Sequence, residues 1–144
     1  MKTHVGAISV VDERVDQFLR EAFESLKEHR GGKRLYRDIR DESGAETDDQ
    51  LNRILVETGS LTGAFHDDVL CAVAMTSPRS RDLVMGIYVS PTKRRHHLAQ
   101  QLLNVLFEGE TPPRDAWVLP GDRATKSLYE KTKWKARRLT MSGD

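Results

Sequence analysis

The chain has 144 residues, 38% of them hydrophobic and 31% charged, a composition that indicates one globular domain over residues 1–144 and excludes a fibrous or disordered protein. Its 23 Lys and Arg residues against 22 Asp and Glu residues give a net charge of +1, which offers no overall field for nucleic acid or anionic lipid. Cys71 is the single cysteine, and no apolar stretch approaches the roughly 20 residues that cross a bilayer, so we expect a cytoplasmic protein without disulfides or a membrane span.

The amino-terminal part predicts a strand followed by a long helix. Residues 5–10 form a short extended run, and Asp12 after it is a good helix N-cap. Apolar residues then recur at spacings of three and four, which predicts a helix with one buried face that ends at Gly31 and Gly32. These apolar residues are Val15, Phe18, Leu19, Ala22, Phe23 and Leu26.

The next part of the chain predicts a loop and a second, shorter helix. Residues 33–46 are dense in charge and carry few apolar anchors, so we expect an irregular loop. Thr47 and Gln50 are spaced as a capping box, and Leu51, Ile54 and Leu55 follow as an apolar face that Gly59 ends. Two helices are therefore expected before the main sheet.

The second half of the chain predicts most of the sheet. Residues 61–65 and 69–75 flank a turn and predict a β-hairpin, and residues 83–89 predict a third antiparallel strand that ends before Pro91. Apolar residues between 98 and 106 predict a helix on that sheet. Residues 116–119 predict a further strand, Asp122 the cap of a last helix, and residues 134–141 a last strand.

A basic run lies where the helix after the third strand begins. Residues 93–97 read Lys-Arg-Arg-His-His. The start of a helix has free N–H groups and a partial positive charge, so cations there are unfavourable unless an anion such as a phosphate is bound. A solvated basic surface is the alternative, and nucleic-acid binding is disfavoured because no aromatic residues interleave. Neighbouring histidines on a helix point about 100° apart, so we expect no metal site.

Two stretches, residues 87–103 and residues 124–131, make the sequence resemble the GNAT N-acetyltransferase superfamily. Residues 87–103, IYVSPTKRRHHLAQQLL, are similar to its acyl-CoA-binding motif, a strand ending V-x-P followed by Q/R-x-x-G-x-G/A, with Arg94 and Ala99 at matching positions. Residues 124–131, ATKSLYEK, are similar to its second signature, which usually runs into glycine and an aromatic residue, here Trp134. The resemblance implies an α/β (α+β) fold with a mixed, mostly antiparallel central sheet flanked by helices, in the order β-α-α-β-β-β-α-β-α-β.

The resemblance also implies an activity, the transfer of an acetyl group from acetyl-CoA to a primary amine by direct attack, with no metal. Backbone N–H groups around Gly86 and Ile87 would polarise the thioester carbonyl. Tyr129 would be the general acid, with a packed helix tyrosine as the alternative, and Asp82 or Glu57 the general base. The residues expected to bind acetyl-CoA are Ile87, Tyr88, Val89, Arg94, Arg95, His96, His97, Leu98 and Ala99.

The sequence departs from the family at two glycines, which are His97 and Lys133 here. A left-handed backbone at His97 would cost about 1 kcal/mol or more. The alternative function is therefore a catalytically silent, GNAT-like acyl-CoA-binding or regulatory protein. The acceptor is expected to be a small-molecule or peptide amine. The short segment after Trp134 leaves little room for two closing strands, which suggests a homodimer.

Overall fold

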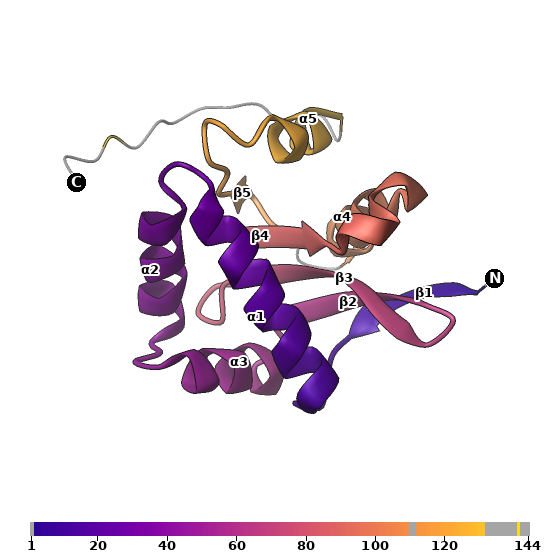
Figure 1. Cartoon of the computed structure of the whole chain (residues 1–144), viewed down its shortest axis with the longest axis horizontal. Helices are drawn as coiled ribbons and strands as arrows, with labels where there is room; N and C mark the ends of the chain where they lie inside the picture. The colour runs from indigo at the N-terminus through magenta and orange to yellow at the C-terminus, as the bar shows by residue number, and fades with distance from the viewer. Residues whose placement is uncertain (1, 110–111, 132–140, 142–144) are drawn as a thin grey trace.

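The structure is a computed structural model that describes residues 2–109, 112–131 and 141. Within that part of the chain, helices cover both faces of a five-stranded sheet (Figure 1). The strands are β1 Thr3–Ala7, β2 Leu61–His66, β3 Val69–Thr76, β4 Leu83–Val89 and β5 Asp115–Ala116. The helices are α1 Glu13–Glu28, α2 Gly32–Ser43, α3 Asp48–Glu57, the 3₁₀ helix η1 Pro91–His96, α4 Leu98–Glu108 and α5 Arg123–Lys131.

The sheet confirms the predicted mixed, mostly antiparallel arrangement. Its order is β1-β2-β3-β4-β5, with antiparallel pairing from β1 to β4 and parallel pairing between β4 and β5. The predicted hairpin is present, and its turn residues Asp67 and Asp68 both have positive φ, 50° and 66°. Two positive φ values are what a tight two-residue hairpin loop requires, because they match the twist of the strands.

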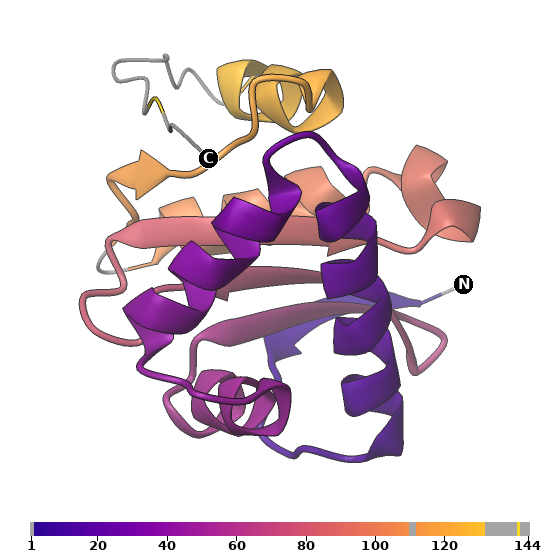
Figure 2. The same cartoon turned by 60° about the vertical axis from the view of Figure 1, so that its left-hand side comes forward.

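The two faces of the sheet bury different cores, as the side view in Figure 2 helps to follow. Helices α1, α2 and α3 pack on one face, over residues such as Val73, Met75 and Met85. Helix α4 packs on the other face, where Leu98 and Leu102 contact the small residues of β2 and β3. Tyr129 of α5 extends that second core beside Val84. β4 therefore has a packed helix layer on each side.

Helix α1 begins and packs as its sequence predicts. The side chain of Asp12 accepts a hydrogen bond from the N–H of Val15 at 2.9 Å, which satisfies one of the free donors of the first turn. All but the last of its predicted apolar residues are buried; Leu26 is half-buried. Leu26 also lines a small cavity at the candidate site.

The predicted loop over residues 33–46 is wrong, because this segment forms α2. Leu35, Tyr36 and Ile39 are few, but they lie on one helical face, and Tyr36 and Ile39 are buried against the α1 core. The charged residues occupy the remaining surface, so their density reflects a strongly amphipathic helix rather than a loop. Gly31, with φ 80°, connects α1 to α2, and three helices precede the main sheet instead of two.

The carboxyl-terminal elements differ in length from their predictions. β5 covers only Asp115 and Ala116, whereas residues 116–119 were expected to be a strand. Asp122 accepts from the N–H of Thr125 at 3.1 Å, and α5 begins at Arg123, as predicted. The predicted last strand over residues 134–141 falls almost entirely outside the described residues, as do Lys133 and Trp134.

Candidate functional site

β4 and β5 diverge soon after they pair. Their parallel ladder joins Leu83 to Asp115 and Val84 to Ala116, and the N–H of Trp117 donates to the carbonyl of Val84 at 2.9 Å. β4 then continues to Val89 with no further β5 partner among the described residues. A wedge therefore opens between residues 85–89 of β4 and residues 117–119 after β5.

Backbone groups of β4 face this wedge. The N–H of Ser90 donates to the carbonyl of Cys71 at 2.8 Å, and the register from Ala72↔Val89 to Met75↔Gly86 is regular. Hydrogen-bonded residues alternate along an antiparallel ladder, so Tyr88 and Gly86 direct their N–H groups to β3. Ile87 and Val89 direct theirs to the wedge. Next to Gly86 the register shifts by one residue, between Met75 and Thr76, as it does at a β-bulge.

A small cavity, which we call the slot, lies at the deep end of the wedge. Its volume is about 30 Å³, enough for a group the size of a water molecule or a methyl group. A Cβ built on Gly86 would meet no atom within 4 Å, so the strand leaves space on this side. The residues that line the slot are Leu26, Leu35, Met85, Gly86, Ile87, Trp117, Val118, Leu119, Asp122 and Thr125.

The basic run follows β4 as a 3₁₀ turn rather than as the start of α4. η1 covers Pro91–His96, and His97 then takes a left-handed conformation with φ 56° and ψ 26°. The first helical bond of α4 joins the N–H of Gln101 to the carbonyl of His97 at 3.1 Å. The N–H groups at the start of α4, from Leu98 to Gln100, have no intrahelical acceptor because of their position. They are available for an anion.

Arg94 lies at the end of β4, beside the wedge. Its Nε donates to the carbonyl of Val89 at 3.3 Å, and its side chain is exposed. Burial raises the pKa of the Tyr88 phenol, Glu21 adds to the rise, and the positive charge of Arg94 opposes it. The guanidinium therefore lies close to Tyr88, within hydrogen-bonding reach of its phenol. The side chains of Arg95 and His96 lie outside the described part of the chain.

Tyr129 and Asp82, the two residues predicted to be catalytic, lie in different surroundings. Tyr129 is 5% exposed and packs beside Val84 and Leu103, and burial raises its pKa, with Asp122 adding to the rise. The phenol therefore stays protonated at neutral pH. Asp82 is exposed and precedes β4, where its carbonyl accepts from the N–H of Asp115. At about 3.3 Å per strand residue, it lies roughly 16 Å along the strand from Ile87.

The structure brings other residues to the wedge that the sequence had given structural roles or none. Asp122 supplies a carboxylate to the slot, where it also accepts from the Thr125 hydroxyl at 2.7 Å. Leu26, Leu35 and Trp117 supply its apolar walls. Only the fold could reveal this grouping, because the four residues come from separate elements with no shared sequence spacing. Among the described residues, no cluster of His, Cys, Asp and Glu is placed to hold a metal ion.

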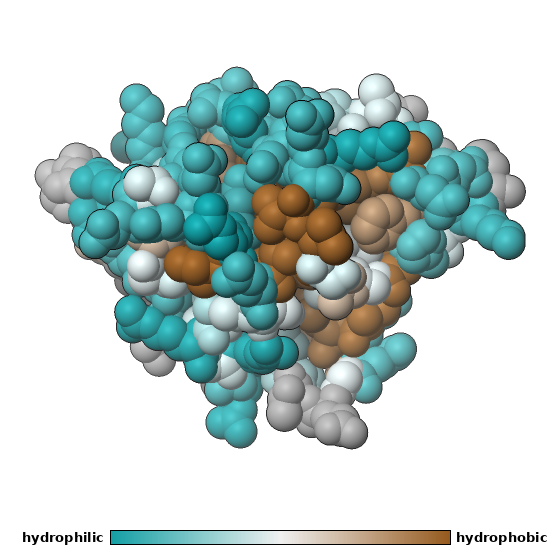
Figure 3. Space-filling view, turned by 90° about the horizontal axis from the view of Figure 1, so that it is seen from below, coloured by the Kyte–Doolittle hydropathy of each residue, from teal (hydrophilic) through white to brown (hydrophobic). Residues whose placement is uncertain are grey.

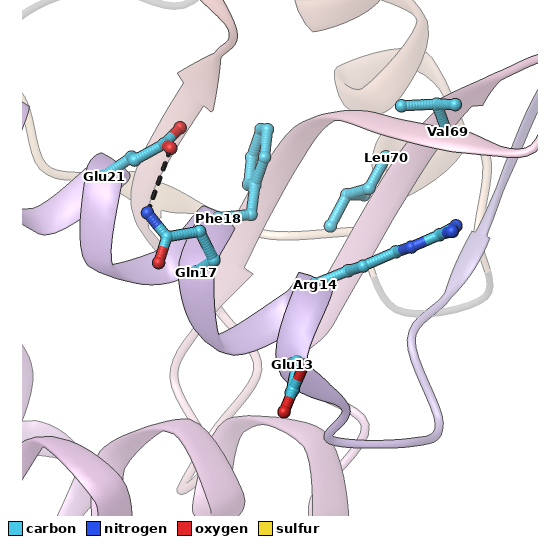
Figure 4. A pocket seen from close by; sticks show the side chains of 7 residues that line it. All are labelled: Glu13, Arg14, Gln17, Phe18, Glu21, Val69 and Leu70. Carbon is cyan, nitrogen blue, oxygen red and sulfur yellow. Dashed lines mark hydrogen bonds between the residues drawn. The ribbon is translucent and has the colours of Figure 1, made fainter.

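A second, larger hollow lies between α1 and the start of β3. Its volume is about 310 Å³, and Figure 4 shows Phe18 and Leu70 facing each other across it. Figure 3 shows the molecule from below, where hydrophobic side chains gather in the middle of that face. Its charged lining residues are Glu13, Glu21 and Arg14, so two carboxylates face one guanidinium and the hollow offers a phosphate-bearing ligand no net attraction. An anionic ligand is better matched to the wedge and the Arg94 turn.

The left-handed backbone at His97 gives a stability prediction. A side chain in this conformation costs about 1–2 kcal/mol, and glycine removes that cost but loses more entropy on folding. We expect His97→Gly to raise the free energy of unfolding by about 0.5–1 kcal/mol in urea denaturation. His97→Ala, which keeps the Cβ, is the control and should give no gain. A glycine variant less stable than the alanine variant would contradict the prediction.

Comparison with known proteins shows the fold. No family model and no curated protein matches the sequence. Several solved structures match the chain along its length, and three of them are described here. AAC(6')-Iy, solved with the bisubstrate analogue CoA-S-monomethyl-acetylneamine, has a TM-score of 0.59 at 13% identity, covering 100% of this chain and 99% of its own. A possible acetyltransferase from Clostridium difficile 630 gives 0.56 at 15% identity, covering 100% and 97%.

The third structure is a ribosomal-protein-alanine N-acetyltransferase from Brucella melitensis biovar Abortus 2308, with a TM-score of 0.51 at 17% identity, covering 98% of this chain and 100% of its own. The chain therefore has the fold of the GNAT acetyltransferases, and the resemblance inferred from its two motifs is confirmed at the level of the fold. Similarity at this level of sequence identity shows the architecture alone, and the chemistry has to be argued from the residues of the site.

Proposed function

We propose that the protein is an N-acetyltransferase that transfers the acetyl group of acetyl-CoA to a primary amine. The observation that carries the proposal is the wedge between β4 and β5, with the Ile87 amide facing it and Arg94 at its open end. The fold neighbours support it, because two are described as acetyltransferases and the third was solved with a CoA bisubstrate analogue.

In this proposal the phosphates of acetyl-CoA bind at the turn after β4. Arg94 offers guanidinium donors, and the start of α4 offers the N–H groups of Leu98 and Ala99 together with the positive end of the helix dipole. His97 leaves its own N–H near the same place. Arg95 and His96 complete the set of residues assigned to the phosphates from the sequence motif.

The acyl end would lie along β4, between Tyr88 and the slot. The Ile87 N–H, which has no β3 partner, would donate to the thioester carbonyl oxygen, and Val89 would bind the pantetheine arm in the same way. The amine would attack the carbonyl carbon directly, so that a C–N bond forms as the C–S bond breaks and CoA leaves as its thiol. The donor at Ile87 stabilises the negative charge that develops on oxygen.

The proton transfers are assigned with the sequence motif as their basis. Tyr129 is proposed as the acid that protonates the departing thiolate, and its raised pKa keeps the phenol in the proton-bearing form. Asp82 is proposed as the base, and at roughly 16 Å from Ile87 along β4 it would need a chain of several water molecules to take the proton of the amine. Both roles need a closer approach to the wedge than the packing of Tyr129 and the position of Asp82 give by themselves.

These positions favour one alternative, a GNAT-like protein that binds acyl-CoA without transferring the acyl group. Tyr129 is packed in a core, and Asp82 lies at the other end of β4 from Arg94. Such a protein would use acyl-CoA as a regulatory ligand. The two functions share the wedge and differ only in turnover.

Calorimetric titration with CoA and acetyl-CoA, followed by a thiol-release assay with a panel of amines, tests the proposal. We expect micromolar binding of both ligands and release of CoA with at least one amine class, small polyamines or peptide amino termini. Binding without thiol release across the panel would favour the regulatory protein. Absence of binding to either ligand would overturn both functions.

A further inference from the structure

The walls of the slot suggest which acyl groups the protein accepts, an inference that rests on the proposed function. We infer that Leu26 of α1 and Leu35 of α2 limit the acyl donor to short, uncharged groups of the size of acetyl. The slot lies beside Ile87, the residue proposed to hold the thioester oxygen, so the acyl chain beyond the carbonyl would point into it.

The size of the slot sets the limit. Its volume of about 30 Å³ matches one methyl group, and β4 and residues 117–119 close two of its sides. Leu26 and Leu35 contribute the helix side, and both are half-buried residues packed against the main core. A propionyl or butyryl group would have to displace them, and each methylene misfitted to an apolar pocket changes affinity by roughly tenfold or more.

The chemistry of the walls excludes a charged acyl terminus. The lining is apolar apart from Asp122 and Thr125, and those two side chains hydrogen-bond to each other at 2.7 Å. An acyl group that ends in a carboxylate would meet the Asp122 carboxylate and lose its hydration without a cationic partner. Acyl groups of the malonyl and succinyl type are therefore disfavoured on charge as well as on size.

The corner between α1 and α2 holds the two leucines in fixed positions. The N–H of Gly32 donates to the carbonyl of His29 at 2.9 Å, and a Cβ on Gly32 would lie 1.8 Å from the carbonyl oxygen of Leu26, so this approach requires glycine. A Cβ on Gly31 would lie 3.5 Å from the Leu119 side chain, which brings the corner against the opposite wall. The leucines thus belong to a tightly packed junction, which fixes their backbone positions on the helix side of the slot.

Titration with CoA, acetyl-CoA, propionyl-CoA and butyryl-CoA tests the inference without needing an acceptor. In the wild type we expect CoA and acetyl-CoA to bind with similar affinity and butyryl-CoA about tenfold or more weakly. Leu35→Ala and Leu26→Ala should bring butyryl-CoA to within about threefold of acetyl-CoA. Leu70→Ala is the matched control, because it removes the same atoms from a half-buried leucine that lines the other hollow.

The outcomes separate the inference from the proposed function. Equal binding of all four ligands by the wild type would overturn the inference and leave the acyl-CoA site intact, as would equal changes in Leu70→Ala and Leu35→Ala. Failure of the wild type to bind CoA itself would overturn the proposed function and, with it, the inference. If an alanine variant unfolds, Leu35→Val removes less volume and should give an intermediate preference in a protein whose melting temperature shows that it is folded.

Discussion

Arg94→Ala is expected to weaken the binding of CoA and acetyl-CoA about 10- to 100-fold, which corresponds to losing charge-assisted hydrogen bonds of about 1.5–3 kcal/mol. Arg94 is exposed at the end of β4, and its Nε is held by the carbonyl of Val89. α4 begins at Leu98, four residues later, and its first N–H groups have no helical acceptors. Calorimetric titration of the purified variant measures the loss.

Two further variants distinguish a specific contact from a general change in charge. Arg94→Lys keeps the charge but loses the planar, two-pronged donor, so we expect it to recover only part of the affinity. Arg79→Ala removes the same charge from the turn between β3 and β4, at the far end of β4, and should bind as the wild type does. Equal weakening in Arg79→Ala and Arg94→Ala would show that no phosphate contact is made at Arg94. Raising the salt concentration should reduce the wild-type affinity more than that of Arg94→Ala.

The parts of the fold that the sequence predicted best are those with strong local patterns. β4 was predicted over 83–89, the range that it occupies, because its apolar run ends at a proline-marked turn. The N-caps at Asp12 and Thr47 were confirmed for a similar reason, since a side-chain oxygen that accepts from an N–H three residues later is a local interaction. α2 was missed because three apolar anchors among many charges resemble a loop until α1 provides the surface on which they pack.

The site was less predictable, because its geometry is not local. The motif after β4 predicted a phosphate-binding turn, which stays a prediction, and it raised the possibility of a left-handed His97, which the structure shows. The slot depends on where α1, α2 and the segment after β5 meet. Leu26 had been assigned to a core face, and Leu35 to a loop, and neither carries a chemical group that would mark a ligand. Sequence patterns reveal hydrogen-bond donors and charged residues more readily than they reveal a cavity formed between distant elements.

Gly86→Ala is expected to weaken the binding of acetyl-CoA about tenfold or more while leaving the protein folded. Gly86 lies opposite Met75, and so on the face of the sheet that α1 covers, and it lines the slot. A Cβ at this position meets no atom within 4 Å, so nothing in the protein resists the methyl group. The methyl group would occupy space that the acyl chain needs. Because alanine loses less entropy than glycine in a strand, the free energy of unfolding should rise by about 0.5–1 kcal/mol.

Gly63→Ala is the matched control, because it should change the stability of the protein and leave its affinity for acetyl-CoA unchanged. Gly63 lies in β2, where a Cβ would come within 2.9 Å of the side chains of Ile8 and Leu70. The same substitution should therefore lower the free energy of unfolding by about 1–2 kcal/mol, the cost of overpacking a core, and leave acetyl-CoA affinity unchanged in the folded fraction. Urea denaturation and calorimetry on both variants give four results. If Gly86→Ala lost stability as Gly63→Ala does, the wedge would already be filled by the protein itself, and the acyl end would have to bind elsewhere. If Gly86→Ala gained stability and lost affinity for acetyl-CoA, the space beside β4 would be a ligand site, because folding alone does not require that space.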